Sequence, residues 1–298
     1  MFTDFSIAKN PVIIDVDGAT DDFLAILYAL KSKEFDVRGI TYQGDGWSHA
    51  GSLGTPGCTY QKSVPESNLG KREHDLLYGL NRQLKLSKRI WYDAIKGFNI
   101  TKNFADLIDS TIKQTGKKTI IIITGPATNI ATLLRAFPTY TKKIHKVFWM
   151  GRALNVHGNL HTVPNNIRAE FNVFLDCVAA QELLDSNLDI TLVPLDFTSK
   201  TPFNASFFDE LSKLKSFYDI FVYKLLSTIR SIWPGGDSAF FTGYYLWDPI
   251  TIAVAKNIGV AKIFVSSNIL TKSKFKIAID AIVGDPIESS PFFQDFLN

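Results

Sequence analysis

The chain has very few cysteines, and they lie far apart. Cys58 and Cys177 are the only two among 298 residues, and neither belongs to a C-x-x-C motif. Two cysteines cannot form the disulfide framework that is typical of small secreted domains. The first ten residues, MFTDFSIAKN, have neither the basic start nor the apolar stretch of a signal peptide. We therefore expect a reducing, cytoplasmic location.

Long apolar runs and blocks of one charge are also missing. No uncharged apolar run reaches the ~18 residues that a membrane helix needs, so no membrane span is predicted. The 32 Lys and Arg residues are scattered among 29 Asp and Glu residues, and the net charge is only +3. Because no basic block is present, nothing favours nucleic acid as a partner. Repeats and evident linkers are absent too, which favours one domain over residues 1–298.

Short apolar runs alternate with helical patterns along the chain. The runs cover residues 11–15, 37–42, 118–124, 146–150 and 190–195, and helical patterns cover 21–32, 129–137 and 178–186. Apolar runs without alternation are typical of strands that are buried on both faces. This order predicts an α/β fold with an open, mainly parallel, Rossmann-like sheet flanked by helices. We interpret residues 44–104 as long loops with some helix, a candidate lid over the site.

Functional sites in such sheets form at the carboxyl ends of the strands. The sequence DVDGATDD (15–22) lies at one predicted strand end, and TGPATN (124–129) lies at another. The first of these places four acids within eight residues. Two kinds of chemistry use acids packed so closely, and we consider them in turn.

The first interpretation is a phosphatase in which Asp15 is the nucleophile and Asp17 the acid/base. The sequence IIDVDGA resembles the D-x-D-G-T motif of haloacid-dehalogenase-like phosphatases. Thr124 and the late pair Gly284–Asp285 match further requirements of that family. Ala19 stands where the motif has Thr, however, and Asp21 and Asp22 are left without a role.

The second interpretation is a metal site built from the same acids. Asp17 follows the strand, and Asp22 lies five residues later, in the first turn of the next helix. A tight turn at Gly18 could direct both carboxylates at one point, and a helix N-terminus tolerates their charge. Hard cations such as Ca²⁺ prefer carboxylate and carbonyl oxygens. The carbonyl of Thr124 and the late carboxylate Asp248 are candidates to complete the site.

Polar residues suited to a sugar accompany these acids. Asn159 follows an expected turn, and Glu170 and Asn172 lie two residues apart in a segment that we expect to be extended, with both side chains on one face. Acid and amide groups accept and donate hydrogen bonds to hydroxyls. Trp247 precedes Asp248 and offers an aromatic surface.

Taken together, these motifs resemble the inosine–uridine-type nucleoside hydrolase family, especially its purine-specific branch. The family opening D-x-D-x-x-x-D-D is met at 15–22, and T-G-P-x-[TS]-N-[IV]-A is met at 124–131. The motif M-G-G-A…G-N followed by A-E-[FW]-N-[IV] is met at 150–173 with one change, and Tyr-Tyr-x-Trp-Asp is met at 244–248. The resemblance implies the nucleoside hydrolase fold and a nucleoside substrate, and a homodimer is the family expectation.

The resemblance also implies a role for each matching residue. The ligands of Ca²⁺ would be Asp17, Asp22, Asp248 and the carbonyl of Thr124, with Asp17 also acting as general base for the attacking water. The substrate contacts would be Asp21, Asn172 and Asp248 at the 2′ and 3′ hydroxyls, Asn159 and Glu170 at the 5′ hydroxyl, Trp247 at the base, and Asp45 near the site. The reaction implied is hydrolysis of the N-glycosidic bond of purine ribonucleosides.

Two departures from the family pattern concern substrate range. Arg152 replaces the second Gly of M-G-G, and Ala19 stands where purine-specific relatives often have Asn. A non-catalytic nucleoside-binding relative, altered at these two positions, is therefore a third hypothesis beside the hydrolase and the phosphatase.

Overall fold

The computed structural model describes residues 9–42, 104–160, 166–200, 203–257, 262–267, 274–279 and 295–296. Its strands are β1 (Asn10–Val16), β2 (Phe35–Tyr42), β3 (Thr119–Ile123), β4 (Ile144–Met150), β5 (Ile190–Val193), β6 (Lys262–Ser267) and β7 (Lys274–Ile279). They form one sheet in the order β2-β1-β3-β4-β5-β7-β6. All neighbouring pairs are parallel except β6 and β7, which are antiparallel.

The helices follow the same alternation. They are α1 (Thr20–Lys31), α4 (Phe104–Thr115), α5 (Thr128–Ala136), α6 (Phe171–Leu175), α7 (Cys177–Asp185), α8 (Leu195–Thr198), α9 (Ala205–Lys213), α10 (Phe217–Ile232), α11 (Gly236–Gly243) and α12 (Trp247–Lys256), with the 3₁₀ helix η3 at Pro138–Lys142. The mainly parallel α/β fold is confirmed, as are the five predicted strands and the three predicted helices. The predicted lid at 44–104 falls almost wholly outside the described residues.

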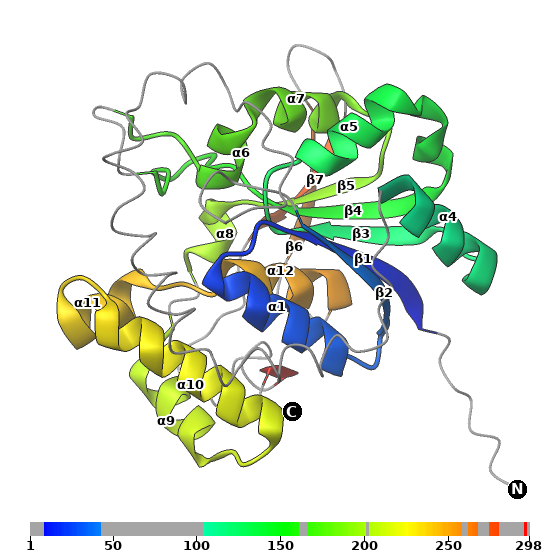
Figure 1. Cartoon of the computed structure of the whole chain (residues 1–298). Helices are drawn as coiled ribbons and strands as arrows, with labels where there is room; N and C mark the ends of the chain where they lie inside the picture. The colour runs from blue at the N-terminus through cyan, green and yellow to red at the C-terminus, as the bar shows by residue number, and fades with distance from the viewer. Residues whose placement is uncertain are drawn as a thin grey trace, which may run out of the picture.

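Helices cover both faces of the sheet, as Figure 1 shows. Along β1, Val12 and Ile14 belong to the core shared with α1 and α12, whereas Ile13 belongs to the core shared with α4, α5 and α7. Successive side chains of a strand point to opposite faces, so an unbroken apolar run is what two covered faces require. The carboxyl ends of β1, β3 and β4 are adjacent in the sheet, and they form the edge at which the acids lie.

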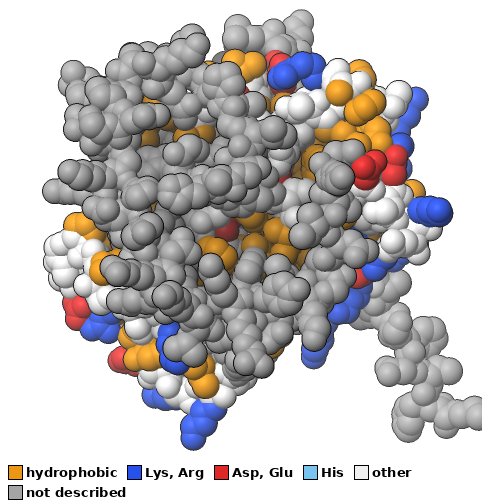
Figure 2. All heavy atoms as spheres, in the orientation of Figure 1, with side chains coloured by type: hydrophobic (Ala, Val, Ile, Leu, Met, Phe, Trp, Pro, Cys, Tyr) orange, Lys and Arg blue, Asp and Glu red, His pale blue; other side chains and the backbone are white. Residues whose placement is uncertain are grey.

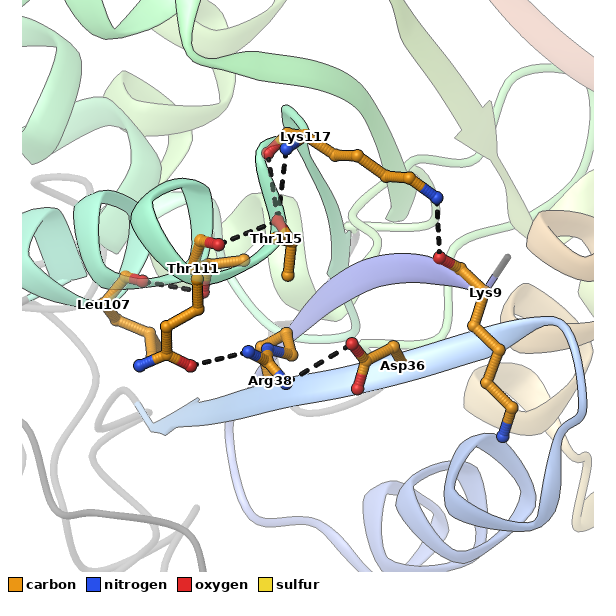
Figure 3. A network of polar contacts seen from close by, with 8 residues as sticks. Lys9, Asp36, Arg38, Leu107, Thr111, Thr115 and Lys117 are labelled. Carbon is orange, nitrogen blue, oxygen red and sulfur yellow. Dashed lines mark hydrogen bonds and ion pairs between the residues drawn. The ribbon is translucent and has the colours of Figure 1, made fainter.

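Figure 3 shows how α4 is fastened to the outer edge of the sheet. The Lys117 side chain donates to the carbonyl of Lys9 at 3.2 Å, and Arg38 on β2 donates to Gln114 on α4 at 2.5 Å. These contacts are exposed and individually weak. Closer in, Gly39 on β2 leaves room for the buried side chain of Leu107.

The surface agrees with the scattered charge of the sequence. On the face shown in Figure 2, the Lys and Arg side chains of the described segments lie among acidic and apolar side chains rather than in one patch. Every helix in those segments is too short or too polar to cross a bilayer.

The first prediction concerns the contact between β2 and α4. A methyl group at Gly39 would lie 2.5 Å from Cδ2 of Leu107, so Gly39→Ala is expected to lower the free energy of unfolding by about 1–3 kcal/mol through overpacking. Urea unfolding measures the loss. The double variant Gly39→Ala, Leu107→Ala should lose less free energy of unfolding than the sum of the two single losses. Strictly additive losses would mean that the methyl group at residue 39 does not clash with Leu107.

Candidate active site

The turn between β1 and α1 brings two of the predicted metal ligands together. Gly18 has a φ of 91°, which glycine adopts without strain. The Asp22 carboxylate accepts from the backbone N–H groups of Gly18 and Ala19, both at 2.8 Å, and Asp17 accepts from Ala19 at 3.1 Å. Ala19 is the N-cap of α1 and has no polar side chain, so Asp22 supplies the cap from the third helical position. The predicted turn at Gly18 is thus present.

The next strand contributes Thr124. Its backbone N–H donates to the carbonyl of Asp15 at 2.9 Å, which continues the pairing of β1 and β3. Its hydroxyl donates to Asp22 at 2.5 Å. The position that follows β3 therefore lies against the acids that follow β1, as two parallel neighbouring strands require.

Asp248 reaches the same place from the far end of the chain. It lies in the first turn of α12, which packs beside α1 (Figure 1). Burial raises the pKa of Asp248 well above its usual range, and the charges of Asp21, Asp22 and Asp17 raise it further. Burial and the charge of Asp22 likewise raise the pKa of Asp21 to about 7. The structure therefore gathers the predicted acids into one buried group.

Such a group needs positive charge to ionise fully. The N-terminal ends of α1 and α12 supply part of it, because each helix N-terminus carries a partial positive charge. A cation would supply the rest, and carboxylate oxygens with a nearby carbonyl are the donors that Ca²⁺ takes. Within the described segments, no group of three or more Asp, Glu, His or Cys side chains is arranged so that it could hold a metal ion as it stands. The oxygen atoms present are of the type that a hard cation takes as ligands. Both carboxylate oxygens of Asp22, however, accept hydrogen bonds from backbone N–H groups or from the Thr124 hydroxyl.

Asp15 is held apart from this group. One oxygen accepts from Thr41 at 2.5 Å and from Asn129 at 2.8 Å, and the other is buried without a partner. The side chain is 0% exposed. Because its hydrogen bonds tie Asp15 to Thr41 and Asn129, we favour a supporting role for this side chain over that of a phosphoryl-transfer nucleophile. Thr41 and Asn129 were not singled out from the sequence, although both lie at or near predicted strand ends.

The segment with Glu170 and Asn172 is not extended, so that expectation was wrong. Glu170 is the N-cap of α6, and its carboxylate accepts from the backbone N–H groups of Asn172 at 2.9 Å and Val173 at 3.0 Å. It also accepts from the N–H of Arg152 at 2.8 Å. The acid thus caps a short helix and holds the loop after β4, which the two-residue spacing could not reveal.

The two predicted amides have clear positions. The amide nitrogen of Asn172 donates to the carbonyl of Thr124 at 2.9 Å and to that of Met150 at 3.2 Å, so it joins the ends of β3 and β4. The oxygen of Asn159 accepts from the N–H of Phe171 at 2.8 Å. Asp196 was missed: both its oxygens accept backbone N–H groups of the loop after β4, from Leu154 and Asn155, at 2.7 Å. Its place directly after a predicted strand end was the available signal.

Aromatic side chains stand beside the acids at the start of α12. The ring of Trp247 lies 6.1 Å from that of Tyr244 and 5.5 Å from that of Tyr245, centroid to centroid. The indole N–H of Trp247 is buried without a hydrogen-bond partner. Tyr244 is buried, and its hydroxyl lies 3.4 Å from that of Thr20. The predicted Asp45 lies outside the described residues.

Arg152 occupies a conformation that favours glycine. Its φ is 71°, in the left-handed region, where an L side chain is strained by roughly 1–2 kcal/mol. The turn directs its N–H at Glu170 and its carbonyl at the N–H of Leu195, 2.9 Å away. This geometry explains why the family motif M-G-G-A has Gly at this position, where Arg152 stands in this chain.

The protein is therefore an α/β protein with an open, mainly parallel sheet and a group of buried acids at the carboxyl edge of that sheet. The family model of the inosine-uridine preferring nucleoside hydrolases matches residues 63–285. The chain belongs to this family. The match begins after the acids at 15–22, which are tied to the matched part through Thr124 and Asp248.

Relatives with known names agree with this membership. Nucleoside hydrolase 3 and nucleoside hydrolase 4 of Arabidopsis thaliana are each 26% identical, over 84% and 75% of the chain. The chain matches only 36% and 50% of the length of these two proteins. The pyrimidine-specific ribonucleoside hydrolase RihA of Salmonella arizonae is 29% identical over 82% of the chain and 78% of its own length.

Solved structures share the fold. The inosine-uridine preferring nucleoside hydrolase from Bacillus anthracis superposes with a TM-score of 0.70 at 19% identity, and the purine-preferring ribonucleoside hydrolase from Gardnerella vaginalis with 0.67 at 21%. Each comparison covers 97% of both chains.

The second prediction tests the strain at Arg152. Arg152→Gly should raise the free energy of unfolding by about 0.5–1 kcal/mol, because the relief of strain exceeds the extra entropy of an unfolded glycine. Denaturant unfolding measures it, with Arg152→Ala as the control that removes the side chain but keeps the strain. Equal stabilities of the Gly and Ala variants would contradict it.

The third prediction concerns Asp15. Burial raises its pKa from 3.8 to about 6, with the charge of Asp22 adding to the effect. The folded metal-free chain therefore holds a proton that the unfolded chain releases, so this group's contribution to stability is complete below pH 4 and declines as pH rises to about 6. Asp15→Asn does not titrate, and its stability relative to wild type should rise over this window by up to about 3 kcal/mol, at 1.36 kcal/mol per pKa unit. Urea unfolding at pH 4, 5, 6 and 7 measures the difference; a constant difference would refute it.

Proposed function

We propose that the protein hydrolyses the N-glycosidic bond of ribonucleosides, with purine nucleosides preferred, to give free base and ribose. The observation that carries the proposal is the buried group of Asp17, Asp21, Asp22 and Asp248 beside Thr124 in a chain of this family. Cleavage of this bond passes through a ribosyl cation. Carboxylates fixed in a buried site stabilise such a charge better than water does.

Ca²⁺ is the cofactor that we infer. Asp17, Asp22, Asp248 and the carbonyl of Thr124 would hold it, and the bound ion would lower the pKa of a water molecule near C1′. Asp17 would accept the proton of that water as its oxygen bonds to C1′ and the bond to the base nitrogen breaks. One proton of the water would thus end on Asp17, and the remaining hydroxyl would end on C1′ of the ribose. The base would leave with the bonding electron pair.

Other residues of the site would bind and orient the ribose. Asp21 and Asp248 would accept hydrogen bonds from the 2′ and 3′ hydroxyls. Asn172 would offer its oxygen to the same edge, because its nitrogen already donates to Thr124 and Met150. Asn159 would face the 5′ hydroxyl through its amide nitrogen. Glu170 accepts three backbone N–H groups, so we assign it the positioning of Asn172 and of the loop at Arg152.

The base preference rests on Trp247. A planar indole at the start of α12 would stack on a purine and favour proton uptake by its ring, so that no separate general acid is needed. The relative RihA is pyrimidine-specific by name. The proposed purine preference is therefore tested by comparing purine with pyrimidine nucleosides as substrates. Three predictions from the sequence are part of this proposal: a single domain over residues 1–298, a homodimer and a cytoplasmic location.

The non-catalytic alternative keeps the same pocket but not the reaction. Its motive is the pair of departures at Ala19 and Arg152. The burial of Asp17, Asp21, Asp22 and Asp248 close to one another supports the hydrolase.

The fourth prediction is that the protein releases ribose from inosine, guanosine and adenosine faster than from uridine. EGTA should abolish the release and added Ca²⁺ should restore it. Asp17→Asn should lower kcat about 10²–10⁴-fold, the range for loss of a general base.

The matched control is Glu182→Gln, which removes a carboxylate from an exposed ion pair with Arg135 and should leave kcat unchanged. Absence of ribose from every nucleoside, with Ca²⁺ present, would refute the proposal. Nucleoside binding by calorimetry without any turnover would establish the non-catalytic alternative instead.

A further inference from the structure

The acid group sits where two parallel helices begin, and those helices are fastened together at their other ends. Asp21 and Asp22 lie in the first turn of α1, and Asp248 lies in the first turn of α12. Toward the other end of the pair, the ammonium of Lys256 lies 4.5 Å from the centre of the Tyr28 ring. The helices therefore run side by side in the same direction, as Figure 1 shows.

The fastening depends on a residue close to the C-terminus. The carboxylate of Asp295 accepts hydrogen bonds from Lys256 of α12 and from the hydroxyl of Tyr28 of α1. Glu34, just after α1, lies 3.6 Å from the same ammonium. One carboxylate thus bridges the two helices, and we name Asp295, Lys256 and Tyr28 the helix clasp.

The ammonium of the clasp is buried, and its carboxylate is partly exposed. The Lys256 side chain is 4% exposed and that of Asp295 is 31% exposed; a buried ammonium requires a counter-ion. The next residue, Phe296, packs 5.1 Å from the Tyr28 ring and 5.7 Å from the Phe207 ring of α9. Asp295 is therefore held in place from two sides, by charge and by apolar packing.

The opposite ends of the two helices meet at the acids. The side chain of Asp21 in the first turn of α1 hydrogen-bonds Asp248 in the first turn of α12, so the two acids are in direct contact. The geometry of this contact depends on how α1 and α12 are placed against each other. Each helix is a stiff rod of ~1.5 Å per residue, so a restraint seven or eight residues along it limits movement at the acids.

We propose that Asp295 is a positioning residue: through Lys256 and Tyr28 it fixes α1 against α12 and thereby sets the spacing between Asp21 and Asp248 in the site. Its catalytic consequence rests on the proposed nucleoside hydrolysis, whereas its effect on the two helices does not.

The fifth prediction uses the whole chain of residues 1–298 with Asp295→Asn, which keeps the size of the side chain and removes its charge. Hydrogen exchange by mass spectrometry should speed up about tenfold at residues 18–24 and 247–251, well below the unfolding midpoint. The kcat for ribose release from inosine should fall by about tenfold, since a misplacement near 1 Å can cost about 10²-fold. Asp295→Glu should recover much of both effects, and Tyr28→Phe should give a smaller change of the same sign.

Glu182→Gln again serves as the control, because its exposed partner Arg135 belongs to neither helix. A lower unfolding midpoint for Asp295→Asn, with hydrogen exchange in the first turns of α1 and α12 unchanged, would overturn the inference. Asp295 would then contribute to stability without positioning the acids. If the wild-type protein releases no ribose, the proposed hydrolysis fails, and the exchange at these turns still decides the role of the clasp.

Discussion

The burial of several carboxylates side by side is the constraint around which the described part of the molecule is organised. Burial raises the pKa of Asp21, Asp22 and Asp248, and the charge of neighbouring acids raises it further at Asp21 and Asp248. Such a group is unfavourable in isolation, and it persists because the turn after β1, the end of β3 and the start of α12 are fixed by their own packing. The sheet and its helices supply the free energy that keeps the acids together.

The acids of this region divide into two kinds according to their hydrogen bonds. Asp22 and Glu170 accept backbone N–H groups at helix starts, so their orientation is set by the main chain. At Asp21 and Asp248 burial dominates the pKa, and the two side chains hydrogen-bond each other. Residues of the first kind are oriented by the main chain beside them, whereas the contact between Asp21 and Asp248 depends on the packing of α1 against α12. The same distinction separates Asp15, whose Thr41 and Asn129 contacts make it structural.

Much of the fold could be predicted because strands covered on both faces need unbroken apolar runs. The strands β6 and β7 lack such runs, since Lys and Ser residues interrupt them, and they were not predicted. The segment at Glu170 was expected to be extended, but it caps α6. The Glu170 carboxylate accepts from the local N–H groups of Asn172 and Val173 and also from the N–H of Arg152, which the end of β4 delivers. No local pattern of residues 169–173 contains the contact with Arg152.

The sequence alone determined which residues follow strand ends, in what order they occur, and to which family their motifs belong. This information is local, since an apolar run and the polar residue after it are neighbours in the chain. The tertiary structure decided that Asp21 lies against Asp248, that Thr124 holds Asp22, and that Arg152 adopts a left-handed turn. It also decided that Asp295 bridges the helices which carry the acids. Those relations join residues far apart in sequence, and only the packing of α1, α12 and the sheet brings them within contact distance.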